Sequence, residues 1–187
     1  MADDRALVSQ VISGDAEAFR QLIRQHERLV SHMVGRMVKR QEDREEVCQD
    51  VFMKVYEKLG EFNFQSQLST WIATIAYRHG INHLRKKKVA ISEIDDDERF
   101  YERFVADDNP ESTLEEQDLD HHIMELIEKL PTQYKVVLTL YHNDGMSYAE
   151  IGTVTGMPEG TVKNYLFRAR QLLKEKIKKH LGAEQFL

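Results

Sequence analysis

The sequence is poor in the residues that break helices, and it has almost no cysteine. Among its 187 residues there are only nine glycines, three prolines and one cysteine. So few chain breakers predict a mostly helical protein. The single Cys48 excludes an intramolecular disulfide framework and is typical of a reducing compartment.

Long hydrophobic runs are also missing. No apolar run approaches the roughly 18 residues that a membrane helix needs, and the N-terminal residues lack the apolar core of a secretory signal. These absences predict no membrane insertion and, by default, a cytoplasmic protein. The 31% of charged residues and 41% of hydrophobic residues are typical of a folded, well-solvated chain.

The net charge of −6 conceals a segregation of charge along the chain. Residues 91–120 hold 13 acids and two bases, whereas residues 62–92 hold no acid and five Lys or Arg. Residues 158–180 are basic again, with seven Lys or Arg against two Glu. Two basic segments that flank an acidic one indicate a polyanionic partner such as nucleic acid.

Hydrophobic periodicity predicts helices and no strands. Apolar residues recur at three- and four-residue steps from Phe19 to Met37, from Val47 to Leu59 and from Leu68 to His79. Asp15 and Ser66 stand where N-caps of the first and third of these helices are expected. The pattern predicts an all-α fold.

The same pattern divides the chain into two small helical domains. The first is expected at residues 1–92, a reasonable size for one small core. Periodicity is lost in the acidic stretch, so residues 93–117 are interpreted as a solvated, flexible linker. It begins again in a second helical domain, residues 118–187.

A helix-turn-helix is indicated in this second domain. Ser147 and Glu150 have the spacing of a capping box that opens a short helix, and Gly156 lies in the turn after it. Pro158 suits the first turn of the longer, basic helix that follows. A short helix, a tight turn and a basic helix together are typical of DNA-binding proteins.

The outer face of this basic helix carries cations, amides and an aromatic ring. It presents Lys163, Asn164, Phe167, Arg168 and Gln171. Arg reads guanine, Asn reads adenine and an apolar group contacts the thymine methyl, so this face suits recognition of duplex DNA. The alternative is a basic amphipathic helix that only packs and keeps the protein in solution.

Two sets of motifs occur in order along the chain. The second set comprises Leu130-Pro131, Gly145 to Ile151, Pro158 to Lys163 and Phe167 to Arg170. The first comprises Asp43 to Phe52, Phe64, Leu68 to Ile72, Ile75-Ala76 and Leu84-Arg85. They resemble regions four and two of the bacterial extracytoplasmic-function (ECF) sigma factors, although Gly152 stands where alanine is usual. The resemblance implies a dissociable polymerase subunit that confers promoter specificity and opens DNA, with neither catalysis nor a cofactor of its own.

The resemblance also implies three groups of site residues. Core polymerase binding falls to Asp43, Glu45, Glu46, Gln49, Asp50 and Phe52. Recognition and melting of the −10 promoter element fall to Phe64, Ser66, Gln67, Arg78, His79, Asn82, Arg85, Lys86, Lys87 and Lys88. Recognition of the −35 element falls to Glu159, Gly160, Thr161, Lys163, Asn164, Phe167, Arg168 and Arg170.

We expect the −10 residues to form one pocket for an extruded base. The loop from Phe64 to Gln67 would contact this base together with Arg78, His79 and Asn82, while the cations hold phosphates. The alternative for each of these residues is an ordinary surface role, and the acids at the polymerase-binding helix could equally favour its dipole. Trp71 lies on an apolar stripe, which favours a core position over base stacking.

Two other classes of function are alternatives to a sigma factor. A polymerase-independent helix-turn-helix regulator would explain the basic C-terminal helix, but neither the acid-free segment nor the acidic linker. A nucleic-acid enzyme is disfavoured because the sequence has no phosphate loop or nucleophile elbow. His121, His122 and Glu125 lack a second ligand cluster, so no metal site is expected. The expected partners are core RNA polymerase, promoter DNA and an anti-sigma factor, and the free protein is expected to be a monomer.

Overall fold

The computed structural model describes residues 2–87 and 119–181, and none of these residues is in a strand. The N-terminal group of helices comprises α1 (Ala2–Ile12), α2 (Ala16–Met37), α3 (Gln41–Lys58), a 3₁₀ turn η1 (Leu59–Glu61) and α4 (Leu68–Lys86). The C-terminal group comprises α6 (Leu119–Lys129), α7 (Thr132–His142), α8 (Tyr148–Thr155) and α9 (Glu159–Leu181). The all-α prediction is confirmed, whereas the predicted linker at 93–117 and Lys88 lie outside the described residues.

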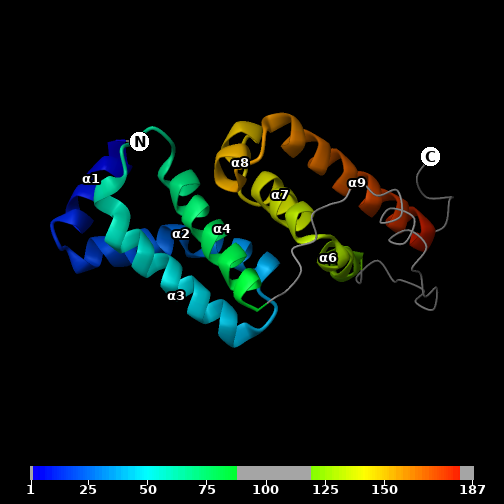
Figure 1. The fold of residues 1–187 in the computed structure, drawn as a ribbon, viewed down its shortest axis with the longest axis horizontal. Coiled ribbons are helices and arrows are strands. Elements are labelled where there is room, and N and C mark those ends of the chain that lie inside the picture. Colours follow the sequence, from blue (N-terminus) through cyan, green and yellow to red (C-terminus); the bar gives the residue numbers. More distant parts are fainter. Residues whose placement is uncertain (1, 88–118, 182–187) are drawn as a thin grey trace.

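The core of the N-terminal group forms where α2 packs against α3 and α4. Leu22 and Met33 of α2, Val51 of α3 and Ile72 of α4 are completely buried there. The helices α2 and α4 cross closely, because a Cβ added at Gly80 would lie 2.3 Å from Cε of Met37. This packing fixes α3 and α4 side by side (Figure 1).

Two predicted helix caps had different outcomes. Asp15 caps α2 as expected, since its carboxylate accepts hydrogen bonds from the backbone N–H groups of Glu17 at 2.8 Å and Ala18 at 3.1 Å. The prediction for Ser66 was wrong, because Gln67 occupies the N-cap position of α4 and makes no side-chain cap bond. Ser66 stands one residue too early, and its hydroxyl donates to the carbonyl of Gln67 at 3.3 Å instead.

The helix α1 was missing from the sequence prediction. It lies against α2 and η1 and buries Leu7, Val8 and Val11, each at most 5% exposed. These residues have the three- and four-residue spacing of a helix face, which is the signal that could have revealed it. The segment therefore adds a helix to the N-terminal core.

The helix-turn-helix forms as the sequence predicts. Ser147 and Glu150 make a complete capping box at the start of α8, and Gly156 ends that helix with a φ of 76°. A residue with a positive φ after a helix is usually glycine, which has no Cβ to clash. Pro158 lies one residue before α9, and its carbonyl accepts from the N–H of Thr161 at 2.9 Å.

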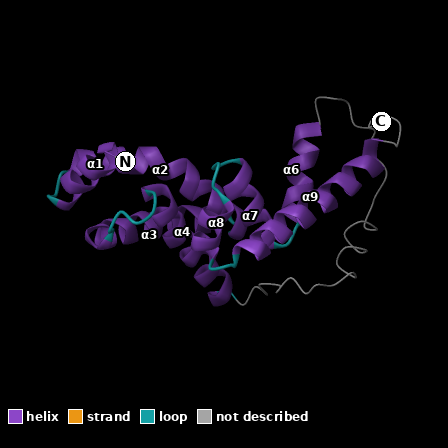
Figure 2. Cartoon of the chain, turned by 90° about the horizontal axis from the view of Figure 1, so that it is seen from above, coloured by secondary structure: helices purple, strands orange, loops and turns teal. Residues whose placement is uncertain are grey.

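The two groups of helices pack against each other through α4 with α8 and α2 with α7. Both views show α7 and α8 next to the N-terminal group, with α6 and the far end of α9 pointing away from it (Figures 1 and 2). Thr70 of α4, only 1% exposed, donates its hydroxyl hydrogen bond to Oε1 of Glu150 in α8 at 3.2 Å. The capping residue of the helix-turn-helix thus also contacts α4.

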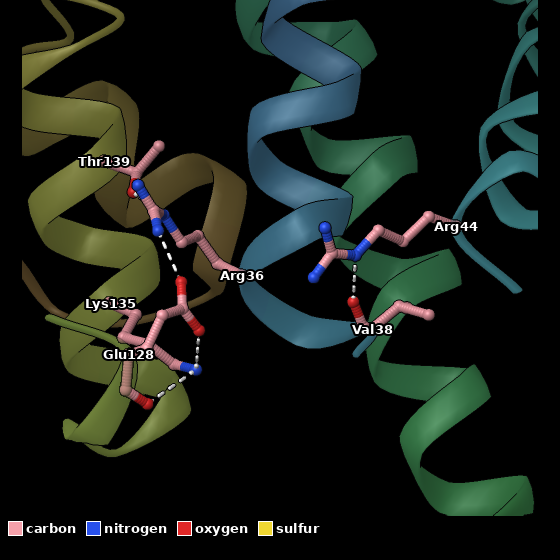
Figure 3. Close-up of polar contacts among 6 residues, drawn as sticks. All are labelled: Arg36, Val38, Arg44, Glu128, Lys135 and Thr139. Carbon is pink, nitrogen blue, oxygen red and sulfur yellow. Dashed lines mark hydrogen bonds and ion pairs between the residues drawn. The ribbon is translucent and has the colours of Figure 1, made fainter. Parts of the chain in front are cut away.

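A second polar contact joins the groups at the end of α2. Figure 3 shows Arg36 reaching from α2 to Glu128, at 2.5 Å, and to the hydroxyl of Thr139, at 3.0 Å. Lys135 lies on the other side of Glu128, with 3.2 Å between the ammonium and carboxylate. Partial burial acts to raise the pKa of Glu128, but Lys135 and Arg36 hold it below its usual range.

Candidate nucleic-acid interface

The exposed face of α9 is a narrow stripe at helical spacing. Successive residues of a helix turn by about 100°, so Gly160, Asn164, Phe167 and Gln171 share one line along it. Phe167 is 61% exposed, unusual for a large aromatic side chain, and Asn164 beside it is also exposed. This stripe offers an amide and an aromatic ring to a ligand.

Cations lie on both sides of this stripe, in different surroundings. Lys163 and Arg170 lie on the flank toward Tyr148 of α8 and Tyr141 of α7, whereas Thr161 and the half-buried Arg168 lie on the opposite flank. On that flank Tyr165 packs edge-on against Tyr134 of α7, with ring centroids 5.2 Å apart. The sequence had placed Arg168 on the fully exposed face, but its side chain is partly covered.

A stacked pair of tyrosines, one from α7 and one from α8, positions Lys163 and Arg170. Tyr141 and Tyr148 stack with ring centroids 5.3 Å apart and an interplanar angle of 16°. Arg170 lies 5.0 Å from the first ring and Lys163 lies 5.4 Å from the second. Lys163 also pairs with Glu159 at 2.7 Å, which raises the pKa of the ammonium group. Both cations are therefore held at the edge of the face, where phosphates of a duplex would lie.

The exposed residues of α4 form a second stripe. Arg78, Asn82 and Arg85 are exposed on one side of the helix, in line with the half-buried Trp71 near its start. His79 lies on the α3 side instead; its burial lowers the pKa of the imidazole, while nearby Asp50 acts to raise it. On the opposite side burial raises the pKa of Tyr77, and Tyr165 of α9 is near enough to contribute.

The structure does not form the single pocket that the sequence led us to expect. Gln67 ends the loop before α4, so at about 1.5 Å per residue Arg78 lies about 16 Å and Asn82 about 22 Å further along the helix axis. One base is too small to touch both the loop and Asn82. The side chains line a track along α4 rather than a pocket, because helical rise separates residues that lie 15 positions apart.

The loop itself has an unusual backbone. Phe64 has a φ of 59°, the one described non-glycine residue with a positive φ. Its half-buried ring contacts Phe62, at 4.6 Å between centroids, and Phe62 in turn contacts Trp71 at 5.3 Å. The exposed side chains of the loop are the amides of Asn63, Gln65 and Gln67. The predicted base-contacting loop, Phe64 to Gln67, includes Gln65 and Gln67 but not Asn63.

The outer face of α3 combines acids with an apolar end. Glu45, Glu46, Gln49 and Asp50 are exposed, whereas Phe52 is half-buried against the core. Asp43 turns toward α4 instead, where its carboxylate accepts from Lys87 at 2.6 Å and lies 3.8 Å from His83. This bond to Lys87 lowers the pKa of Asp43. Asp43 and Lys87, predicted for different partners, are therefore bound to each other.

Sequence reasoning missed two exposed apolar residues on α3. Met53 is 57% and Tyr56 is 47% exposed. With Phe19 and Asp15 they border a surface hollow of about 310 Å³ at the start of α2. The signal was present, since Met53 lies two residues after Val51 and outside the buried stripe of α3.

These features define a class of protein before any comparison: an all-helical, two-part DNA-binding protein with a helix-turn-helix and a separate acidic face. The family model "Sigma-70 region 2" matches residues 22–89, and "Sigma-70, region 4" matches residues 121–173. The sigma-E factor of Escherichia coli K12 is 32% identical over 180 residues, which cover 93% of this chain and 94% of that protein.

Two further relatives are also sigma factors. SigW, an ECF sigma factor of Bacillus subtilis, is 30% identical over 91% of this chain and 95% of its own. The sigma-H factor of Pseudomonas aeruginosa is 30% identical over 91% of both chains. The chain belongs to the ECF sigma factor family, as the motifs predicted, and it directs RNA polymerase to promoters.

Solved structures agree with the fold. CnrH in complex with the cytosolic domain of CnrY has a TM-score of 0.66 at 21% identity, covering 94% of this chain and 97% of that one. RpoE of Bartonella quintana, in complex with the anti-sigma factor NepR, has a TM-score of 0.63 at 22% identity, covering 87% and 98%. Among the helices within residues 2–87 and 119–181, none is both long and apolar enough to cross a membrane.

Proposed function

We propose that this sigma factor uses three separate helical faces for three tasks. The outer face of α3 binds core RNA polymerase, the loop before α4 and the stripe along α4 bind the opened −10 strand, and α9 reads the −35 duplex. Residues 1–92 would form the domain for the first two tasks and residues 118–187 the domain for the third, joined by 93–117. The observation that carries this proposal is that each face lies on a different helix and has its own chemistry.

The polymerase face would combine charge with one apolar contact. Glu45, Glu46, Gln49 and Asp50 would meet basic residues of the polymerase, and the adjacent Met53 would add a desolvated anchor. Charges of this kind steer association, whereas a buried apolar side chain slows dissociation. Phe52 would support the face from below, since it packs against the core.

The −10 strand would run along α4. Its cations would neutralise phosphates, and the loop at one end and Asn82 near the other would each face a different nucleotide. The separation of about 22 Å along the helix spans several nucleotides of a single strand. Two positions of the −10 element would thus be read independently.

The −35 duplex would lie across α9. Asn164 and Phe167 would face the base edges, with Lys163 and Arg170 on the phosphates beside them. Of the remaining assigned residues, Glu159, Gly160 and Thr161 belong to the first turn of the helix, and Arg168 lies on the flank where Tyr165 packs against Tyr134. A helix-turn-helix enters the major groove with the N-terminal part of this second helix, which agrees with the location of these residues.

In this proposal the protein acts without catalysis and without a cofactor. It would be a cytoplasmic monomer when free, and an anti-sigma factor is its proposed regulator. The support for this regulator is the similarity of fold to two sigma factors that were solved with a partner protein. The regulatory character of the family supports the absence of catalysis.

A run-off transcription assay tests the proposal. Purified protein added to core polymerase should initiate at a defined set of promoters, which sequencing of the bound DNA would identify. Asp50→Arg should weaken holoenzyme formation without loss of fold, because a surface change typically alters stability by about 0.5 kcal/mol or less. Glu27→Arg, an exposed site on α2, is the matched control. Promoter binding that needs no polymerase, with no run-off product, would instead show a regulator.

A further inference from the structure

A residue of α1 contacts the loop before α4 at the position with the unusual backbone conformation. The guanidinium carbon of Arg5 lies 4.7 Å from the centroid of the Phe64 ring. The backbone of Phe64 has a φ of 59°, which is rare for an aromatic amino acid. Such a conformation persists only when its surroundings hold it in place.

The contact is one end of a continuous chain of rings. Arg5 covers Phe64, Phe64 packs on Phe62 at 4.6 Å, and Phe62 packs on Trp71 at 5.3 Å. Phe62 is only 6% exposed and belongs to the core, so the chain anchors the loop to the body of the protein. A guanidinium over an aromatic face is attracted by the ring electrons in addition to packing.

The helix that carries Arg5 is itself firmly anchored. Leu7, Val8 and Val11 of α1 are buried in the same core, and α1 touches η1 immediately before the loop. Arg5 is exposed, so its side chain closes the outer side of the Phe64 ring. The position of this guanidinium is therefore set by α1, which lies before the segment matched by the region 2 model.

The consequence lies in the side chains on either side of Phe64. With the Phe64 ring turned inward, Asn63, Gln65 and Gln67 are left exposed. Asn63 accepts a hydrogen bond from the N–H of Gln65 at 3.2 Å, which further limits the loop. Amides carry both donors and acceptors, so a loop that presents them in fixed places can discriminate between unpaired bases.

We propose that Arg5 is a positioning residue for base reading at the −10 element. It acts through Phe64, which is a support of the loop rather than a base contact. The exposed amides of Asn63, Gln65 and Gln67 are the groups that meet the base. This inference rests on the proposed role of the loop in −10 recognition.

The first test uses the protein without polymerase or DNA. The sequence contains one tryptophan, Trp71, at the far end of the ring chain. Arg5→Ala should change the emission and the acrylamide quenching of Trp71, whereas Arg24→Ala, which removes an exposed arginine of α2 paired with Glu17, should not. Unchanged Trp71 fluorescence in Arg5→Ala would overturn the proposal.

The second test measures promoter opening by the holoenzyme with permanganate footprinting. Arg5→Ala should reduce opening about two- to fivefold, the size of one exposed cation–π contact. Binding to core polymerase and to the −35 duplex should be unchanged. Arg5→Ala should also reduce the selectivity between single strands that differ at one −10 base, because a loosened loop discriminates less between bases.

A double-mutant cycle separates positioning from direct DNA contact. In a Phe64→Leu background, Arg5→Ala should have no further effect on promoter opening. The same cycle is repeated in a Phe64→Gly background, because glycine adopts a positive φ without backbone strain. Effects that multiply, or a log–log salt slope for single strands lowered by about 0.7, would make Arg5 a phosphate contact and overturn the proposal. A wild-type holoenzyme that opens no promoter would refute the proposed function, while the Trp71 test would still decide the role of Arg5.

Discussion

Asp144, in the turn between α7 and α8, is a half-buried carboxylate whose Oδ2 atom has no hydrogen-bond partner. Burial raises its pKa to about 6, although Arg28 of α2 acts to lower it. In the unfolded chain an aspartate titrates near 3.9. Between about pH 4 and pH 6 the folded protein therefore binds more protons than the unfolded chain, so stability falls as the pH rises through this window.

We expect Asp144→Asn to stabilise the protein at pH 7 by about 1 kcal/mol, after allowance for solvent screening of a half-exposed group. The variant should also lose most of the pH dependence of stability between about pH 4 and 6. Thermal melts across this range measure both effects. Glu27→Gln makes the same change in charge at an exposed site of α2 and should leave the pH profile as in wild type.

Gly152 in α8 differs from the alanine usual in the family, and its surroundings give the reason. A Cβ at this position would lie 2.8 Å from the backbone oxygen of Met157, in the turn that leads to α9. A backbone atom cannot move aside as a flexible side chain can. The close approach of this turn to α8 therefore requires glycine.

We expect Gly152→Ala to destabilise the protein by about 1–3 kcal/mol, the usual cost of overpacking. Gly160→Ala is the matched change in α9, where a Cβ would meet nothing within 4 Å. It should stabilise by about 0.4–1 kcal/mol, because alanine leaves the unfolded chain fewer conformations to lose than glycine does. Urea unfolding compares the pair; equal stability of the two variants would contradict the role given to Gly152.

At the scale of elements, helix caps were predictable from the sequence, whereas contacts between elements far apart in the sequence were not. Asp15 and the capping box of Ser147 and Glu150 act within four residues, so spacing alone identifies them. The short α1 was overlooked because its apolar stripe has only three buried residues. The left-handed Phe64, whose ring meets Arg5 of α1, involves a contact between distant elements, which periodicity does not encode.

The track along α4 predicts that its two ends act on different bases. Gln67→Ala in the loop and Asn82→Ala near the far end should each weaken opening, with the loss of selectivity at different positions of the −10 element. Permanganate reactivity on promoters with each −10 base replaced in turn would locate the two positions. Loss of selectivity at the same base in both variants would instead support a single pocket for one base.

At the scale of the whole molecule, the packed arrangement is too short for the two promoter elements that α4 and α9 are proposed to bind. Elements named −35 and −10 lie about 25 base pairs apart, which is ~85 Å at about 3.4 Å per base pair. The reading helices α4 and α9 would span only about 63 Å even if laid end to end, and here α4 lies against α8. If α4 and α9 bind the two elements as proposed, the two groups of helices must separate before both elements are bound.

Within the described residues, side-chain hydrogen bonds join the two groups, two from Arg36 and one from Thr70, and they lie beside a cluster of buried hydrophobic residues that includes both groups. We expect Arg36→Glu to open the packed form, because it replaces the ion pair with Glu128 by repulsion and removes the bond to Thr139. The loss should be about 1–3 kcal/mol, since Arg36 is only 16% exposed and bonds to a charged partner. Small-angle scattering should show a larger radius of gyration. Promoter binding by the holoenzyme should tighten by about five- to a hundredfold, because less free energy is then needed to reach the open form.

The control for this prediction is Arg24→Glu, which reverses the charge of an exposed arginine on the same helix, paired only locally with Glu17. It should alter neither the radius of gyration nor promoter affinity. Hydrogen exchange gives a second readout, since opening should expose the amides around Thr70 and Glu150, where α4 and α8 touch. An Arg36→Glu protein that keeps the compact radius and the slow exchange at both sites would show that this ion pair does not hold the two groups together, and the force that keeps α4 on α8 would then lie in the buried contacts around Thr70.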